Sequence, residues 1–137
     1  MNKSYTDIEQ SKKLAEILPI ESADMCWTNH CYGNIRSSLT VSSKTIEEYK
    51  NLLTRFANLT DIDCFYPCWS LAALFSVIPK RIKDYNVLRI DISNNDFAIW
   101  YDEIGYGVNN DLPNITKETT IDACHEMIVR LHELNLL

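Results

Sequence analysis

The sequence predicts a single α+β domain, residues 1–137, in which antiparallel hairpins pack in two layers against three or four helices. Three observations predict this fold class: two helix-start motifs in the first half, an alternating hairpin pattern in the second half, and a short apolar segment between them. The chain has the length of one independently folding unit. Its composition, 46% apolar and 23% charged residues, is that of an ordinary globular protein.

Two elements are expected in the first forty residues. A helix is predicted over residues 7–18, because Thr6 and Glu9 form a T-x-x-E capping box and Pro19 ends the helix. Residues 25–41 are rich in Cys, Trp, Thr, Tyr and Ser, and Gly33-Asn34 lies near their middle. This pattern predicts two strands joined by a turn at Gly33-Asn34.

A second helix is expected over residues 45–58, where Thr45 and Glu48 form another capping box. Apolar side chains recur there with helical spacing at Ile46, Tyr49, Leu52, Leu53 and Phe56. Residues 58–63 are rich in turn-forming residues and predict a connection.

The segment 66–79 is predicted to form the centre of the core. Ser70 is a good helix N-cap, and Pro79 closes a helix of about two turns that is apolar on nearly every side and therefore buried. Three basic residues follow, and we expect them to complement the carboxyl end of this helix rather than to bind an anion: Lys80, Arg81 and Lys83.

The second half contains the clearest strand pattern. Residues 85–92 alternate, with Leu88, Ile90 and Ile92 on one face; residues 93–96 form a turn, and residues 97–101 return as the partner strand. Residues 104–108 predict a short third strand, residues 109–116 a loop, and residues 120–134 the last helix. The apolar stripe of that helix consists of Ile121, Cys124, Met127, Ile128, Leu131 and Leu134.

Several broad classes of protein do not fit the sequence. The polar start of the chain has no apolar core of a secretory signal, and the apolar run 71–78 is too short to span a bilayer, so a cytoplasmic protein without membrane association is expected. The net charge is −6, and residues 84–137 contain ten acidic but only three basic side chains. Direct binding to nucleic-acid phosphates, which selects clustered Lys and Arg, is therefore not expected.

Four cysteines and one histidine are candidates for a metal site. Soft ligands occur in two groups with spacings C-x3-H-C and C-x3-C, namely Cys26, His30 and Cys31, and Cys64 and Cys68. Structural zinc sites usually have C-x2-C spacing, and tryptophans flank these cysteines, so buried thiols are favoured over a metal centre. We therefore expect no metal ligands and no cofactor.

Catalytic motifs are also missing from the sequence. Cys124 and His125 are adjacent on a helix, where their side chains diverge by about 100° and cannot form a nucleophile–base pair with each other. With three glycines, the chain has no phosphate-binding loop. Asp102, Glu103 and Asp111 lack the spacing of a calcium loop. The expectation is a protein that is not an enzyme.

The most suggestive surface is the predicted hairpin of residues 85–101. Phe97, Ile99 and Tyr101 share one face of its second strand, and Ala98 and Trp100 share the other. Because only one face packs against helices, Trp100 is exposed or is covered by residues 104–114, by a partner or by a second copy of the chain. The candidate interaction surface consists of Trp100, Tyr101, Asp102, Glu103 and Tyr106.

Three blocks of the sequence resemble a family of small proteins: EQSKKLAEILPIESADM (residues 9–25), PCWSLAALFSVIP (67–79) and DACHEMIVRLHELNLL (122–137). Their order and spacing make the resemblance specific, whereas residues 27–65 depart from the usual members. This uncharacterised family occurs in gut anaerobes of the Bacteroides type, often beside phage or mobile-element genes. The resemblance implies a setting but no mechanism, and no site residues are carried over from it.

The sequence thus favours a small acidic, non-enzymatic binding or regulatory protein with a protein partner, in a phage or mobile-element setting. Two alternatives stay open. One is a metal-binding protein or small enzyme that uses the Cys/His groups, and the other is a structural component that works as a homo-oligomer.

Overall fold

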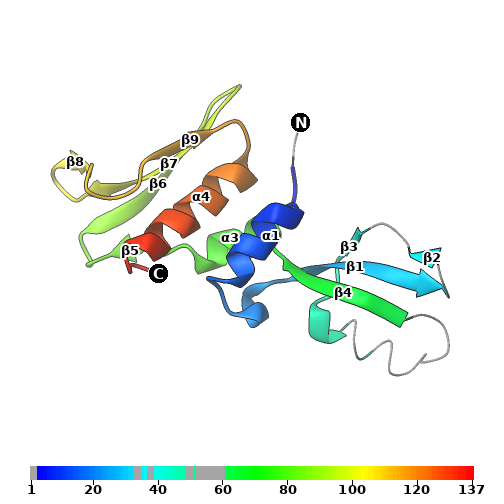
Figure 1. Cartoon of the computed structure of the whole chain (residues 1–137). Coiled ribbons are helices and arrows are strands. Elements are labelled where there is room, and N and C mark those ends of the chain that lie inside the picture. Colours follow the sequence, from blue (N-terminus) through cyan, green and yellow to red (C-terminus); the bar gives the residue numbers. More distant parts are fainter. Residues whose placement is uncertain (1–2, 33–34, 37–38, 49–50, 52–60) are drawn as a thin grey trace. The chain divides into compact units, whose positions relative to one another are not determined.

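Figure 1 shows a computed structural model of the protein, which describes residues 3–32, 35–36, 39–48, 51 and 61–137. For residues 29–32, 35–36 and 61–65 only the backbone is described. The described residues form helices and antiparallel sheets, which confirms the predicted α+β class. The chain divides into an amino-terminal unit, Tyr5–Ala73, and a carboxy-terminal unit, Leu74–Leu137 together with Met1–Ser4. The expectation of one domain stays a prediction, and each unit is described by itself.

The amino-terminal unit is built around the long strand β1 (Met25–Tyr32), which pairs antiparallel with β2 (Ile35–Arg36), β3 (Thr40–Ser42) and β4 (Asp61–Cys68). The pairing of β1 with β2 confirms the predicted hairpin, whose turn residues 33–34 lie outside the described residues.

The first helix, α1 (Ile8–Ala15), is shorter than predicted, and its cap is shifted by one residue. Asp7, not Thr6, is the N-cap: its carboxylate accepts from the backbone N–H of Gln10 at 2.8 Å, and the Gln10 side chain accepts from Asp7 N–H at 3.2 Å. The Thr6 hydroxyl instead lies buried, 2.8 Å from the Ser11 hydroxyl, and accepts from Trp69 N–H at 3.1 Å. A tertiary contact thus removes Thr6 from the capping role.

Trp69 and Leu14 lie at the centre of the amino-terminal core, and neither is exposed to solvent. The indole Nε1–H of Trp69 donates to the hydroxyl of Ser22, in the 3-10 turn η1 (Ile20–Ser22), at 2.9 Å. The amide hydrogen of a buried indole thereby has the partner that its burial requires.

The middle of the chain is described in part, and one segment of it differs from the prediction. Thr45 caps a helix as predicted, because its hydroxyl accepts from Glu48 N–H at 3.1 Å; residues 46–48 and 51 are helical, and residues 49–50 and 52–58 of the predicted range 45–58 lie outside the described residues. Residues 61–63, predicted as part of a turn, belong to β4. Their strand conformation comes from pairing with β1, a partner thirty or more residues away that local composition does not reveal.

Helix α3 (Leu71–Val77) follows β4, and Ser70 caps it as predicted, because the Ser70 hydroxyl accepts from Ala73 N–H at 3.2 Å. Burial is less complete than predicted: Ala72 and Ser76 are exposed. Lys80 has the expected role, since its ammonium group donates to the carbonyls of Phe75 and Ile78 at the end of this helix. Among the described residues, the other two basic side chains form no such hydrogen bond: Arg81 donates to the Asp84 carbonyl at 3.2 Å, and Lys83 lies in the turn that follows Ile82.

The carboxy-terminal unit contains the predicted hairpin. Strands β6 (Asn86–Ile92) and β7 (Phe97–Glu103) pair antiparallel along their full length, from Asn86 opposite Glu103 to Ile92 opposite Phe97. The turn closes where Ser93 N–H donates to the Asp96 carbonyl at 2.9 Å. The short strand β5 (Arg81–Ile82) pairs with β6.

Two further strands pair with β7 where the sequence predicted a strand and a loop. Strand β8 is restricted to Gly107–Val108, because residues 104–106 form the turn that leads into it. Strand β9 (Ile115–Lys117) begins inside the predicted loop and pairs with the start of β7. Pairing with β7 thus holds residues 115–117 in strand conformation, although their local sequence pattern does not predict a strand.

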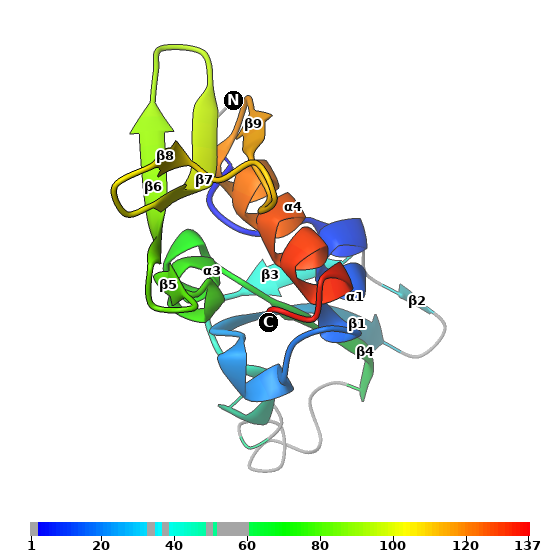
Figure 2. The ribbon, with the colours of Figure 1, turned by 90° about the vertical axis from the view of Figure 1, so that its left-hand side faces the viewer.

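Helix α4 (Thr120–Glu133) packs along one face of this sheet, against β7 and β9 (Figures 1 and 2). Its predicted stripe is confirmed except at Leu134, which is exposed and forms the C-cap. Thr119 is the N-cap, since its hydroxyl accepts from Asp122 N–H at 3.1 Å. No helix among the described residues is both long enough and apolar enough to cross a membrane.

Candidate functional site: the outer face of the carboxy-terminal sheet

The hairpin of β6 and β7 has two distinct faces. Phe97, Ile99 and Tyr101 are buried on the face that α4 covers. The intervening residues of β7 point to the opposite face, which we call the outer face: it carries Trp100 and Asp102 of β7, with Arg89 of β6 opposite Trp100 and Val108 of β8 opposite Asp102. Trp100 and Asp102 are half-buried.

Asp102 organises this face through two hydrogen bonds. One carboxylate oxygen accepts from the indole Nε1–H of Trp100 at 2.8 Å, and the other accepts from Nε of Arg89 at 3.3 Å. The carboxylate therefore fixes the indole ring and a guanidinium group on one surface. Arg89 is not among the residues predicted from the sequence, because its place on this face follows only from the register of β6 against β7.

Tyr101, predicted as part of the interaction surface, belongs to the opposite face. Its side chain is fully buried, and its hydroxyl donates to the carbonyl of Pro79 at 2.6 Å. Burial raises the pKa of this phenol above its ordinary value, so the hydroxyl stays protonated as a donor. Tyr101 therefore anchors β7 from inside the unit and presents no exposed surface.

Exposed apolar side chains gather at the turn between β7 and β8. Ile104 is 55% exposed, Tyr106 84% and Val108 47%, and Tyr85 beside them is 48% exposed. The Tyr85 carbonyl accepts from Ile104 N–H at 2.8 Å, which joins the two segments. The turn is defined by Tyr106 N–H donating to the Glu103 carbonyl at 3.0 Å and by glycines 105 and 107, whose φ angles of 87° and 81° suit glycine.

The structure separates the neighbours Asp102 and Glu103. Whereas Asp102 lies on the outer face, Glu103 lines a cavity on the other side of the strand, which it shares with Asp111. Of the three carboxylates considered as a cation site from the sequence, two therefore lie in one cavity and the third does not. Of the predicted surface, Trp100 and Asp102 touch directly, Tyr106 lies on the adjoining turn, and Tyr101 and Glu103 point elsewhere.

The cysteines whose side chains are described behave as buried thiols. Burial raises the pKa of Cys26 to about 11 and that of Cys124 to about 12, and it also raises the pKa of Cys68. Thiols with such pKa values are weak nucleophiles and weak metal ligands at neutral pH. The side chains of His30, Cys31 and Cys64 lie outside the described residues, and the described residues contain no group of three metal-ligating side chains.

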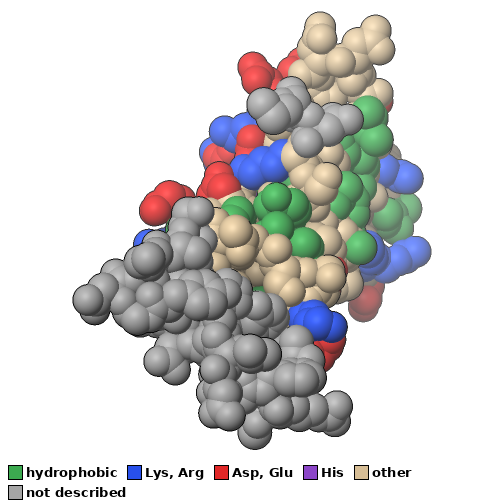
Figure 3. Space-filling model, turned by 90° about the vertical axis from the view of Figure 1, so that its right-hand side faces the viewer, with side chains coloured by type: hydrophobic (Ala, Val, Ile, Leu, Met, Phe, Trp, Pro, Cys, Tyr) green, Lys and Arg blue, Asp and Glu red, His purple; other side chains and the backbone are tan. Residues whose placement is uncertain are grey.

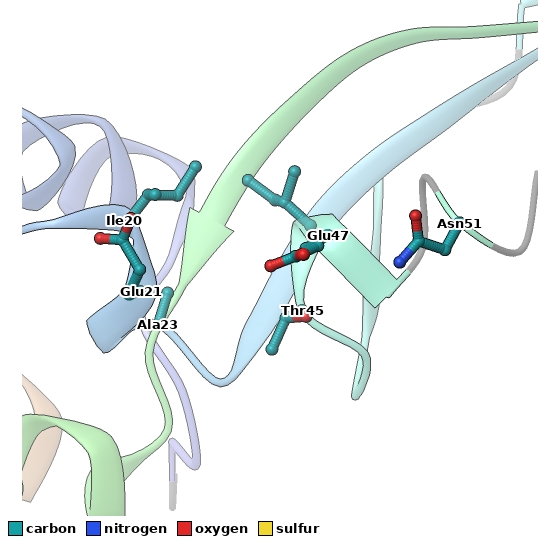
Figure 4. A pocket seen from close by; sticks show the side chains of 7 residues that line it. Ile20, Glu21, Ala23, Thr45, Glu47 and Asn51 are labelled. Atoms are coloured by element: carbon teal, nitrogen blue, oxygen red, sulfur yellow. The ribbon is translucent and has the colours of Figure 1, made fainter.

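A second cavity, of about 430 Å³, lies in the amino-terminal unit (Figure 4). Ile20, Ala23 and Ile46 give it apolar walls, and the carboxylates of Glu21 and Glu47 come from two different elements. These two charges have the same sign, and no basic side chain is among the described residues that line this cavity, so it lacks the opposite charges that would orient a ligand.

Among the described residues of the face in Figure 3, acidic and basic side chains lie near one another around hydrophobic side chains. The described part of this face shows no continuous basic area for a phosphate backbone. Comparisons with protein-family models, with curated proteins and with solved structures found no match to this chain. The family resemblance stays a prediction, and the functional argument rests on the geometry of the site.

Proposed function

We propose that this chain is a non-enzymatic binding protein of the cytoplasm, which docks a protein partner on the outer face and on the adjoining β7–β8 turn. The observation that supports the proposal is the concentration of exposed apolar side chains at this turn beside the half-buried Trp100. Contiguous exposed apolar residues next to an ordered aromatic side chain are typical of protein–protein interfaces. The family resemblance adds a phage or mobile-element setting to the proposal.

The charges of this surface indicate the chemistry of the partner. Asp102 is already neutralised in part by Arg89, but Asp91 and Asp96 of the same hairpin are exposed and have no ion-pair partner among the described residues. A basic segment of the partner would complement them. An arginine on that segment could also stack on the face of the Trp100 indole, which Asp102 holds in place.

The experiment is capture from a lysate of the source organism by the immobilised protein, with two surface variants. Tyr106→Ser removes the most exposed aromatic ring among the described residues without touching the core, and Trp100→Asp removes the indole. Ile20→Ser is the matched control, because Ile20 is an exposed apolar residue, 51% exposed, in the other unit. Circular dichroism checks that each variant is folded.

We expect a basic protein that the wild type and Ile20→Ser capture and that both surface variants lose. Its affinity should fall by about tenfold or more in Tyr106→Ser, since exposed aromatic residues at interface centres contribute strongly to binding. It should also weaken at high salt, because the complementary charges are screened. Identical captured proteins with all four chains would contradict the proposal.

A further inference from the structure

A cavity of about 420 Å³ lies at one end of the carboxy-terminal unit, on the other side of β7 from the outer face, and Tyr85 beside the β7–β8 turn is among its lining residues. It is formed by the β5–β6 turn, the end of β7, the loop after β8 and the residues that follow α4. Its volume falls in the range of small-molecule sites. All the elements that form it are in the described part of the chain.

Two carboxylates and one ammonium group of the described residues line this cavity, and they form no ion pair with one another. Lys83 comes from the β5–β6 turn, Glu103 from the end of β7 and Asp111 from the loop after β8. Within the described residues, neither carboxylate makes an ion pair or a side-chain hydrogen bond, and the Lys83 ammonium makes none either. Opposite charges that line one cavity without forming an ion pair are available to a ligand that has both a positive and a negative group.

The polar floor of the cavity is fixed in place. Asn86 is 2% exposed; its side-chain N–H donates to the Ile82 carbonyl at 3.2 Å, and its carbonyl oxygen accepts from the Asn109 amide at 2.9 Å. The Asn109 side chain in turn accepts from Asp111 N–H at 3.0 Å. This chain of amides holds the backbone of the loop that carries Asp111 against β6, so the loop is in place before any ligand arrives.

The position of Lys83 is also constrained. Lys83 and Asp84 both have positive φ angles, 53° and 61°, a backbone conformation that L-residues other than Asn and Asp rarely adopt. Two consecutive residues with positive φ are typical of a tight hairpin turn, which here joins β5 to β6 and sets the point at which the Lys83 side chain leaves the backbone. The remaining lining residues are aliphatic or aromatic: Ile82, Tyr85, Leu112, Leu134 and Leu136.

We propose that this cavity binds a small zwitterion of the α-amino-acid class with an apolar side chain. The Lys83 ammonium would take the carboxylate of the ligand, Glu103 and Asp111 would take its ammonium group, and its side chain would lie against the leucines. Lys83 disfavours a bare metal cation, and the two carboxylates disfavour a simple anion, so a ligand with both charges fits best. This inference does not depend on the proposed partner-binding function.

The test is titration of the ¹⁵N-labelled full chain with L-leucine, followed by the side-chain amide signals of Asn86 and Asn109. Leucinamide, which lacks the carboxylate, and 4-methylpentanoate, which lacks the ammonium group, are the single-charge analogues. We expect saturable shifts with leucine and about tenfold weaker binding of each analogue, because each loses one charge-assisted contact.

Substitutions of the cavity residues test whether leucine binds in this cavity. Lys83→Gln and Glu103→Gln should each weaken leucine binding about tenfold. Glu118→Gln, a change at an exposed glutamate that does not line the cavity, should leave leucine binding unchanged. Absence of saturable shifts at millimolar leucine, or leucinamide binding as tightly as leucine, would overturn the inference. Neither result bears on partner capture by the outer face, so the two proposals fail independently.

Discussion

The Tyr101 hydroxyl offers a direct test of how the candidate surface is supported. Tyr101→Phe removes the donor that binds the Pro79 carbonyl at 2.6 Å and leaves the fully buried ring in place. Because the ring is retained, the substitution creates almost no cavity. The expected loss of stability therefore has two sources: the hydrogen bond that is removed, and the Pro79 carbonyl that is left without its donor.

The magnitude follows from the burial of the two groups. A neutral hydrogen bond contributes about 1 kcal/mol net, and an acceptor left unsatisfied in the interior costs about 1–3 kcal/mol. Pro79 is only half-buried, so water can partly replace the lost donor. We expect the free energy of unfolding to fall by about 1–2 kcal/mol, which in a unit of this size lowers Tm by about 4–8 °C per kcal/mol.

The assay is urea unfolding followed by ¹⁹F NMR of the chain labelled with 5-fluorotryptophan. Trp100 reports on the carboxy-terminal unit, and Trp27 and Trp69 report on the amino-terminal unit. Tyr106→Phe is the control, since the hydroxyl of this exposed residue has no partner among the described residues. An unchanged Trp100 transition in Tyr101→Phe would refute the assignment of Tyr101 as a buried anchor.

Three further predictions concern the fold. Asn135 has a φ angle of 57° just after α4, so Asn135→Gly should raise and Asn135→Ala should lower thermal stability, each by up to about 1 kcal/mol in calorimetry. Lys117, the larger influence, and Arg130 hold the pKa of Glu126 below its ordinary value, so this carboxylate stabilises the fold above the ordinary pKa and the stabilisation is lost as pH falls through the lowered one. Glu126→Gln should therefore cost about 0.5–1 kcal/mol in urea unfolding at pH 7 and nothing at pH 2; an equal cost at both pH values would contradict the ion-pair account. Mass spectrometry after brief iodoacetamide treatment at pH 8 should find three cysteines unmodified until the chain unfolds: Cys26, Cys68 and Cys124.

Local sequence patterns predicted the elements whose conformation depends on residues close together in the chain. The alternation of Leu88, Ile90 and Ile92 identified β6, and the turn residues 93–96 fixed where the chain returns as β7. The apolar stripe of α4 was equally clear, because helical periodicity over four turns leaves little ambiguity.

The sequence did not predict the features that depend on contacts with residues far away along the chain. Thr6 and Asp7 are both acceptable caps, and the contact of Thr6 with Trp69 selects Asp7. Strand β4 exists because it pairs with β1, and β9 because it pairs with β7.

The same limit applies to the candidate site. Trp100 and Asp102 are two residues apart on a strand, so their contact could be anticipated from the alternation of strand faces. Arg89 joins them only through the register of the hairpin. The burial of Tyr101 depended on which face α4 covers, which alternation alone does not specify.

The most direct test of the proposed function is hydroxyl-radical footprinting of the chain with and without the captured partner. If the outer face and its turn bind the partner, oxidation of Trp100, Ile104 and Tyr106 should decrease in the complex. Oxidation of Ile20 and Leu137, two exposed apolar residues that are not part of that surface, should stay the same. Unchanged oxidation of Tyr106, the most exposed of these side chains, in a saturated complex would contradict the proposed function.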